Sequence, residues 1–183
     1  MTPELLSNAL GIRIGRAEKW AAHIADALDR FEINTPLRQA AFLAQIGHES
    51  CGLACTREIW CPQQCAWQVH YEGRADLGNT EPGDGMRFMG RGLIQITGRA
   101  NYRACAEAFG QDFENSPALL ELPHWAALSA GWYWQSRRIN ALADKRLIAD
   151  ITRKINGGLT GLADRLALYQ RACAALGVEE EKN

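Results

Sequence analysis

Apolar residues recur at helical spacing along most of the chain. Over Arg16–Phe31 they fall at steps of three and four residues, which predicts an amphipathic helix. A second helix is predicted over Pro36–Ser50, because Thr35 is a good N-cap and Pro36 suits the first helical position. Its residues are apolar on most sides, as in a buried helix, and Gly52 is placed to end it.

The middle of the chain has the weakest helical pattern. "NTEPGDG" is typical of a turn, and Met86–Thr97, "MRFMGRGLIQIT", predicts one or two short strands or an extended loop with glycine breaks. Helical patterns resume over Arg99–Phe109, Pro123–Ser136, Leu142–Ile155 and Leu162–Leu176. We therefore predict a mainly α fold whose helices frame an irregular, glycine-rich middle, where binding residues tend to lie.

Composition and charge narrow the function classes. The 183 residues suffice for one domain or two small lobes, and the net charge of −1 with no dense Lys/Arg run argues against a nucleic-acid binder. No window reaches the ~18 apolar residues of a membrane span, so no stable membrane insertion is expected. The N-terminal segment lacks a signal-peptide pattern, which predicts synthesis in the cytoplasm.

Four of the six cysteines, Cys51, Cys55, Cys61 and Cys65, lie within fifteen residues. The spacing resembles that of zinc ligands, but the five residues between the two pairs leave little room for the usual loop. Disulfides would require export from a reducing cytoplasm. We favour small free cysteines in the core and expect no metal and no cofactor.

Glu49 is the first candidate for chemistry, because it ends the predicted buried helix. Burial and the partial negative charge of a helix C-terminus both favour the neutral carboxyl that a general acid needs. The alternative is a structural ion pair, with Arg38 or Arg57 as the partner.

Hydrolysis of a glycosidic bond requires a second carboxylate, ~6.5–9.5 Å from the first in inverting enzymes. Glu58 is nine residues further on and can cooperate with Glu49 only if the chain turns between them. Glu72 and Asp76 are rivals, whereas Glu81 and Asp84 lie in a turn-like segment and are expected to face solvent.

Other chemistries have weaker support in the sequence. "GRGLIQITGR" lacks the Lys-Ser/Thr of a phosphate-binding loop, and "GDGMRFMG" lacks the strand-turn-helix context of a dinucleotide site. His48 and Ser50 are two apart on a helix and point to different faces. The four histidines show no paired spacing for a metal.

Several segments in order resemble one known family. "FLAQIGHESCG", "MGRGLIQITGRANY", "AALSAGWYW" and "INGGLTGLADRLALYQR" span Pro36–Arg171 and resemble glycoside hydrolase family 19, which contains plant chitinases and many phage endolysins. The short loops are most similar to the bacteriophage endolysin branch that acts on Gram-negative peptidoglycan. The glycine pair usual after the catalytic serine is Cys51-Gly52 here, and the resemblance does not explain the cysteine cluster.

The resemblance implies a lysozyme-like, two-lobed helical fold with a small irregular or β segment lining a central cleft. One catalytic domain would span residues 1–183, with a glycine-rich lobe at about 52–97 and no separate wall-binding domain. Glu49 would be the general acid. The second carboxylate is Glu58 by the endolysin pattern, with Glu72, closer to the plant spacing, as the alternative base.

The resemblance also assigns cleft positions. Thr97 would help hold the catalytic water, and Arg165 would pair with cleft carboxylates. The positions assigned to substrate binding are His48, Gln95, Asn101, Tyr102 and Asn156, together with Arg165. From the residues alone, Gln95 could bond only to backbone, Tyr102 could be core, and Arg165 could cap a helix.

The function implied is an endolysin that hydrolyses β-1,4 bonds between N-acetylated sugars of peptidoglycan with inversion, causing host lysis. We expect a monomer made in the host cytoplasm that reaches periplasmic glycan strands through a pore formed by another protein. The alternatives are a chitinase on the same fold and a wall-binding module with a degenerate site.

Overall fold

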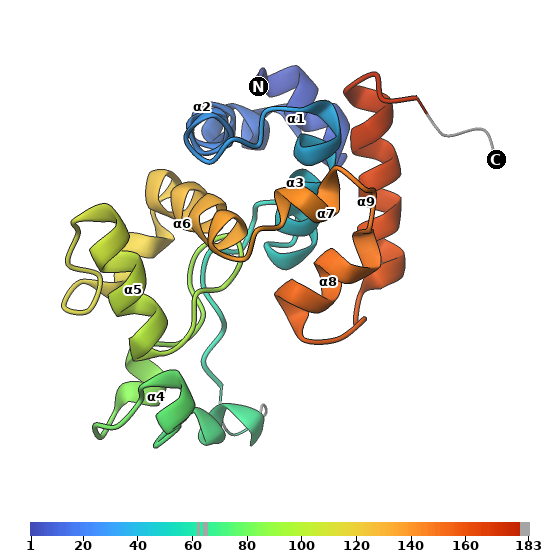
Figure 1. Cartoon of the computed structure of the whole chain (residues 1–183). Coiled ribbons are helices and arrows are strands. Elements are labelled where there is room, and N and C mark those ends of the chain that lie inside the picture. The colour runs from blue at the N-terminus through green and yellow to red at the C-terminus, as the bar shows by residue number, and fades with distance from the viewer. Residues whose placement is uncertain (62, 64–65, 180–183) are drawn as a thin grey trace.

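The computed structural model describes residues 1–61, 63 and 66–179, and it has a larger helical body and a smaller lobe (Figure 1). In the body, α3 packs against α9, α2 against α6, and α1 against both α2 and α9. The smaller lobe, at the bottom of Figure 1, holds α4 and short 3-10 turns. The principal helices are α1 (Pro3–Leu10), α2 (Ile14–Arg30), α3 (Pro36–Glu49), α5 (Arg99–Phe109), α6 (Pro123–Ser136) and α9 (Leu162–Ala175).

Helix α3 is the buried helix that the sequence predicted. The Thr35 side chain accepts a hydrogen bond from the Arg38 N–H at 3.3 Å, and Pro36 occupies the first turn. Every residue over 40–47 is buried, Gln45 included, because helices pack around α3 on all sides. The C-terminal end of this helix, where Glu49 lies, emerges from the core.

Helix α1 was not predicted from the apolar periodicity. Helix α1 begins after Thr2, whose side chain accepts a hydrogen bond from the Leu5 N–H at 3.2 Å, and it buries Leu6, Ala9 and Leu10. Thr2-Pro3 is a usable start signal, but eight residues are too few for a clear apolar repeat.

The predicted helix over Leu142–Ile155 is wrong as a single element. The chain forms α7 (Asn140–Ala143), turns, and starts again as α8 (Ile148–Asn156). Arg146 has a φ of 56°, and the Leu147 N–H donates to the Leu142 carbonyl at 3.0 Å, which closes the turn. The turn brings α8 back against α9.

The predicted strands over Met86–Thr97 form only isolated antiparallel bridges, in which Arg91 pairs with both Arg57 and Ile96. Residues 86 and 87 instead belong to α4 (Asp84–Arg87). Gly92 and Gln95 both have positive φ, so the segment folds back on itself too tightly for a regular ladder. Short 3-10 turns that the sequence did not predict are η1 (Ala66–Tyr71), η2 (Ala75–Leu77) and η3 (Pro117–Glu121).

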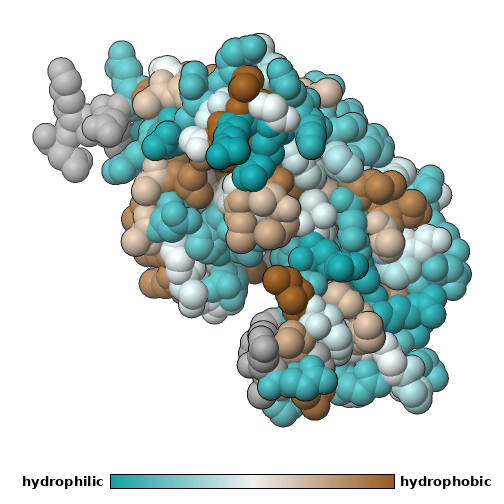
Figure 2. Space-filling model, turned by 180° about the vertical axis from the view of Figure 1, so that it is seen from behind, coloured by the Kyte–Doolittle hydropathy of each residue, from teal (hydrophilic) through white to brown (hydrophobic). Residues whose placement is uncertain are grey.

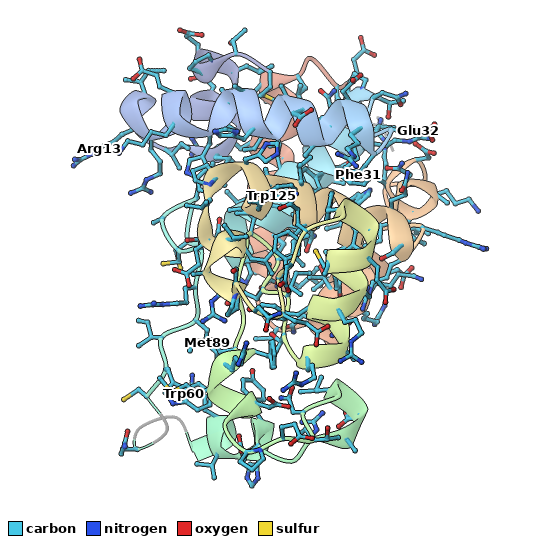
Figure 3. The ribbon with its side chains drawn as sticks, turned by 90° about the vertical axis from the view of Figure 1, so that its left-hand side faces the viewer. Arg13, Phe31, Glu32, Trp60, Met89 and Trp125 are labelled. Atoms are coloured by element: carbon cyan, nitrogen blue, oxygen red, sulfur yellow. The ribbon has the colours of Figure 1, made fainter. Side chains whose placement is uncertain are left out.

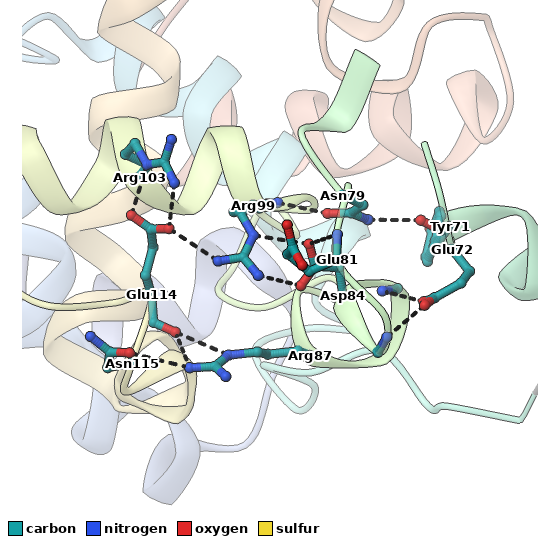
Figure 4. A network of polar contacts seen from close by, with 12 residues as sticks. Tyr71, Glu72, Asn79, Glu81, Asp84, Arg87, Arg99, Arg103, Glu114 and Asn115 are labelled. Carbon is teal, nitrogen blue, oxygen red and sulfur yellow. Dashed lines mark hydrogen bonds and ion pairs between the residues drawn. The ribbon is translucent and has the colours of Figure 1, made fainter. Parts of the chain in front are cut away.

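Polar contacts, more than apolar burial, organise the smaller lobe (Figure 4). Asp84 was expected to face solvent, but its side chain is 2% exposed and pairs with Arg99. Arg99 also lies 3.5 Å from Glu114, which binds Arg103 at 2.9 Å. The guanidinium of Arg99 holds the pKa of Asp84 below its usual value. The lobe is thus tied to α5 by charge.

The cysteines are divided between surface and core. Cys51 and Cys55 are exposed, which contradicts the prediction of core thiols, whereas Cys105 and Cys173 are buried. Burial raises the pKa of the Cys105 thiol to about 12. Cys65 lies outside the described residues. Among the described residues no His, Cys, Asp and Glu side chains gather in a metal-binding arrangement, and no helix is long and apolar enough to cross a membrane.

Candidate active site

Glu49 ends α3 beside a buried arginine from α9. The Arg165 side chain is 1% exposed, and its Nη2 donates to Glu49 Oε1 at 2.5 Å. Its Nη1 donates to Gln45 Oε1, one turn earlier on α3, also at 2.5 Å. The predicted pairing of Arg165 with a cleft carboxylate is therefore present. Glu49 itself stays 18% exposed, so it faces solvent with one oxygen fixed.

Neither of the ion-pair partners considered from sequence holds Glu49. Arg38 binds Asp144 at 2.7 Å, and Arg57 approaches Glu121 at 3.9 Å. The observed partner, Arg165, lies 116 residues away in the chain, so spacing could not identify it.

His48 lies at the same helix end and faces α9. Its Nδ1 is 2.6 Å from Asp164 Oδ2, and the ring packs onto Gly161. A Cβ on Gly161 would lie 2.3 Å from the ring, and the φ of +74° favours glycine. His48 thus packs between the end of α3 and the start of α9.

On α6, burial and then the charge of Glu49 raise the pKa of Tyr133.

Glu58 lies on the smaller lobe, where both of its carboxylate oxygens accept hydrogen bonds. Gln68 Nε2 donates to Oε1 at 2.9 Å, and the Gly90 N–H donates to Oε2 at 3.2 Å. The Glu58 N–H also donates to the Gly90 carbonyl at 2.9 Å. Gly90 therefore fixes Glu58 through both backbone and side chain.

Two other predicted residues, Gln95 and Thr97, lie against Gly90. A Cβ at this position would lie 2.6 Å from Gln95 Oε1 and 3.3 Å from Thr97 Oγ1, so only glycine fits without displacement. Thr97 Oγ1 donates to the Gln95 carbonyl at 2.9 Å, and Asn101 donates to the Thr97 carbonyl at 2.7 Å. Glu58, Gln95 and Thr97 thus gather around Gly90, and Asn101 binds the backbone of Thr97.

Two other predicted substrate contacts lie differently. Tyr102 is completely buried, and its hydroxyl donates to the Met89 carbonyl at 2.7 Å and accepts from Arg91. A sugar in a surface cleft cannot reach it, so Tyr102 supports the cleft wall from behind. Asn156 ends α8 and is exposed, close to the start of α9.

Glu72, the alternative base, has a structural role in the smaller lobe (Figure 4). It is exposed, and it accepts the Gly83 N–H at 2.5 Å and the Gly85 N–H at 2.8 Å. These bonds secure the start of α4 and occupy both carboxylate oxygens. Both oxygens of Glu58 also accept hydrogen bonds, but Glu58 lies next to Gly90, which Gln95 and Thr97 also approach.

A surface pocket of about 630 Å³ opens beside Glu58. The space-filling view shows a hollow between the helical body and the smaller lobe (Figure 2). Two of the pocket residues, Trp60 and Met89, lie along one edge of the molecule (Figure 3). The Arg57 side chain in its wall is 60% exposed. The pocket is lined by Ala54, Cys55, Thr56, Arg57, Glu58, Ile59, Trp60, Met86, Met89 and Glu121.

Sequence reasoning missed two side chains around Glu58. Gln68 is 1% exposed and uses its amide fully, donating to Glu58 and the Ile59 carbonyl and accepting the Cys61 N–H. Burial, and then the charge of Glu58, raise the pKa of Tyr71 to about 12. Both come from η1, whose short sequence carries no motif that signals a positioning role.

Comparison with known proteins identifies the family. Residues 33–153 match the model of glycoside hydrolase family 19, described as class I chitinase. A family 19 domain-containing protein of Haemophilus influenzae is 34% identical over 160 residues, which cover 73% of this chain and 78% of that protein. Endochitinase 1 of Theobroma cacao is 29% identical, and the matched region is 76% of this chain and about half (53%) of the plant protein.

The fold agrees with this assignment. A solved bacterial family 19 chitinase superimposes with a TM-score of 0.76 at 25% identity, over 99% of this chain and 97% of that one. The mainly helical, lysozyme-like architecture expected from the sequence is thereby confirmed. The chain belongs to glycoside hydrolase family 19 and is a glycoside hydrolase.

Proposed function

We propose that this glycosidase hydrolyses β-1,4 bonds between the N-acetylated sugars of peptidoglycan with inversion, Glu49 being the general acid and Glu58 the general base. The two carboxylates come from different parts of the fold, α3 of the helical body and the smaller lobe. Each is fixed by its own hydrogen bonds, and the chain turns between them at residues 50–54. Inverting glycosidases need two carboxyl groups with room for a water between them.

In this proposal Glu49 protonates the oxygen of the leaving sugar. Arg165, itself held by Gln45, fixes the orientation of Glu49 from the core side, which leaves one carboxyl oxygen for the substrate. The proton transferred ends on the leaving hydroxyl, and the carboxylate formed is stabilised by the guanidinium already beside it. Arg165 is thus a positioning residue for the acid.

Glu58 removes a proton from a water on the opposite face of the sugar ring. The Thr97 hydroxyl and the Gln95 amide, gathered with it around Gly90, would orient that water. Gln68 fixes one Glu58 oxygen in the same way that Arg165 fixes Glu49. Exposed Asn156 and half-buried Asn101 are available to sugars on either side.

The pocket beside Glu58 is the observation that favours peptidoglycan as substrate. Chitin is a neutral, unsubstituted polymer, whereas muramic acid carries a lactyl group and a peptide that need open space next to the cleft. The pocket of about 630 Å³ supplies that space. Chitin remains the second candidate, because relatives such as the Theobroma cacao protein are described as endochitinases.

The deciding experiment compares purified sacculi with chitin oligomers, with release of soluble reducing ends as the measurement. Faster cleavage of sacculi supports the proposal, and cleavage of chitin alone refutes it. Binding to sacculi without any reducing ends would instead favour a wall-binding module.

Replacement of Glu49 by Gln tests the acid. Because general acid catalysis contributes ~10²–10⁴-fold, Glu49→Gln should lose at least about a hundredfold in rate on sacculi and on permeabilised cells. Unchanged circular dichroism and thermal unfolding would show that the fold is intact. Lysis within a few-fold of the parent would remove Glu49 from this role.

We further propose the cellular role of a phage endolysin, a monomer made in the host cytoplasm that is released to the periplasm through a separate pore-forming protein. Expression in a Gram-negative host with and without such a pore tests it. Lysis that requires both the pore and Glu49 is expected, and lysis independent of the pore would contradict the export route.

A further inference from the structure

A second hollow of about 610 Å³ adjoins the pocket beside Glu58, and basic side chains line it. Arg13, Arg16 and Lys19 contribute three positive charges, and no acidic side chain belongs to the lining. Ala54 lines both hollows, so they share a wall. The remaining lining residues are Ile14, Gly15, Trp20 and Leu53. The proposed catalytic steps use none of these side chains.

Two of the three cations are available to a ligand. Arg13 and Lys19 are exposed, and neither side chain has a hydrogen-bond or ion-pair partner among the residues that the structure describes. Arg16 is fixed at the edge, because its Nη1 donates to the Gly52 carbonyl at 3.0 Å. Glu18 is not part of the lining, although its carboxylate lies 3.9 Å from where a Cβ of the lining residue Gly15 would be. A hollow walled by one sign of charge concentrates ligands of the opposite sign.

The floor of this groove is apolar and belongs to the core. Trp20 is 5% exposed and Leu53 3%, whereas Ile14 at the rim is 46% exposed. Leu53 reaches the groove because Cys51, Gly52 and Leu53 all have positive φ, which turns the chain sharply after Glu49. The same turn therefore shapes the end of the catalytic helix and the wall of the groove.

The distance between groove and site suits a short peptide. Ala54 and Glu58 are four positions apart in the chain, and four residues span at most ~14 Å when extended. Arg13 and Trp60, from the groove and from the pocket, project from the same edge of the molecule (Figure 3). A peptide of four or five residues attached to a sugar in the cleft has about that reach.

We propose that this basic groove binds the carboxylates of the short peptide carried by muramic acid while the glycan lies in the cleft. The inference rests on the proposed action on peptidoglycan and adds a second point of contact outside the sugar sites. Cations on one wall and an apolar floor match a peptide with several carboxylates and small apolar side chains. An uncharged glycan without peptides gains nothing from the groove.

The test compares intact sacculi with glycan strands freed of peptide by an amidase. The double variant Arg13→Ala/Lys19→Ala should raise KM for intact sacculi about fivefold to tenfold, with kcat within about twofold. On peptide-free strands it should match the wild type. Raising the salt concentration should reduce the wild-type advantage on intact sacculi, because the contacts are exposed.

A matched control removes two exposed positive charges elsewhere whose side chains have no hydrogen-bond or ion-pair partner among the described residues, with Arg138→Ala/Lys145→Ala. An equal KM change in the control would show a general charge effect and overturn the groove assignment. Equal KM values of the wild type and the Arg13/Lys19 variant on intact sacculi would overturn it while leaving the proposed function in place. Failure of the wild type to cut either form, with chitin oligomers cut, would refute the proposed function itself and the inference with it.

Discussion

At the residue scale, the two proposed catalytic carboxylates are held in contrasting ways. Glu49 is bound by a buried cation, Arg165, whereas Glu58 accepts neutral donors from Gln68 and Gly90. The two carboxylates therefore differ in the charge of the groups that bind them: one is bound by a cation and the other by neutral amides.

The choice between Glu58 and Glu72 can be decided by parallel substitutions. Glu58→Gln should lower kcat by ~10²–10⁴-fold, because the base is lost while its hydrogen bonds can still form in part. Glu72→Gln should keep kcat within about threefold and lower the thermal midpoint slightly, because Glu72 accepts two N–H groups at the start of α4. The reverse order of kcat values, with both variants folded, would assign the base to Glu72.

At the scale of elements, α6 approaches α2 through a glycine. A Cβ on Gly131 would lie 2.3 Å from the Phe31 ring, which is itself buried. Gly131→Ala should therefore destabilise the protein by about 1–3 kcal/mol, as measured by urea unfolding. Gly15→Ala on α2 is the control, because its Cβ would meet only Glu18 at 3.9 Å, and a gain of up to about 1 kcal/mol is expected. A Gly131→Ala variant as stable as the control would show that the contact is loose.

The smaller lobe depends on Asp84. Arg99 lowers the pKa of the Asp84 carboxyl in the folded protein. The ion pair therefore contributes its full stabilisation above the unfolded pKa of ~4, and this stabilisation is lost as the pH falls through the folded pKa. Asp84→Asn should lose about 1.5–3 kcal/mol at pH 7, because it removes the charged group that Arg99 binds most closely and leaves Arg99 only its 3.5 Å contact with Glu114. The gap between wild type and variant should shrink below about pH 4.

Hydrogen exchange locates this effect, because loss of Asp84 should raise exchange in residues 71–87 before the rest of the molecule. Among the residues between Leu53 and Phe88 whose burial the structure describes, no apolar side chain belongs to the hydrophobic core. Apolar packing therefore adds little to the stability that polar contacts give the lobe. A constant gap across the whole pH range would contradict the ion-pair explanation.

At the scale of the whole molecule, two hydrophobic clusters share aromatic residues. The larger unites α1–α3 with α6–α9, and the smaller surrounds Phe88, Tyr102 and Phe113. Trp125 packs against both, with ring centroids 5.7 Å from Phe109 and 5.4 Å from Phe113. Such sharing is expected to couple the two clusters during unfolding.

Calorimetry should therefore give one unfolding transition. Trp125→Ala should lower its midpoint and cost ~3–5 kcal/mol without splitting it. Ile59→Ala, at a side chain that is 82% exposed, should stay within about 0.5 kcal/mol of the wild type. Two resolved transitions in the wild type would instead show independently folding parts, against the predicted single domain.

The sequence by itself determined the helices that have a local signal. The Thr35-Pro36 pair correctly predicted the start of α3. Apolar periodicity predicted α5 and α6 with the same bounds that the structure shows. It also identified Glu49, because a charge at the end of an apolar helix stands out and because the surrounding motifs resemble those of one family. Local caps and apolar repeats act within a few residues, so the sequence alone can reveal them.

Only the tertiary structure decided which residues meet. Arg165 reaches Glu49 across 116 residues, Gly90 gathers Glu58 with Gln95 and Thr97, and Tyr102 turns into the core. Asp84, which looked like a solvent-facing turn residue, is buried by an arginine fifteen positions away. These outcomes depend on packing between distant segments, where burial and charge pairing outweigh local preference. The basic groove next to Ala54 likewise depends on the turn of the chain at residues 51–53.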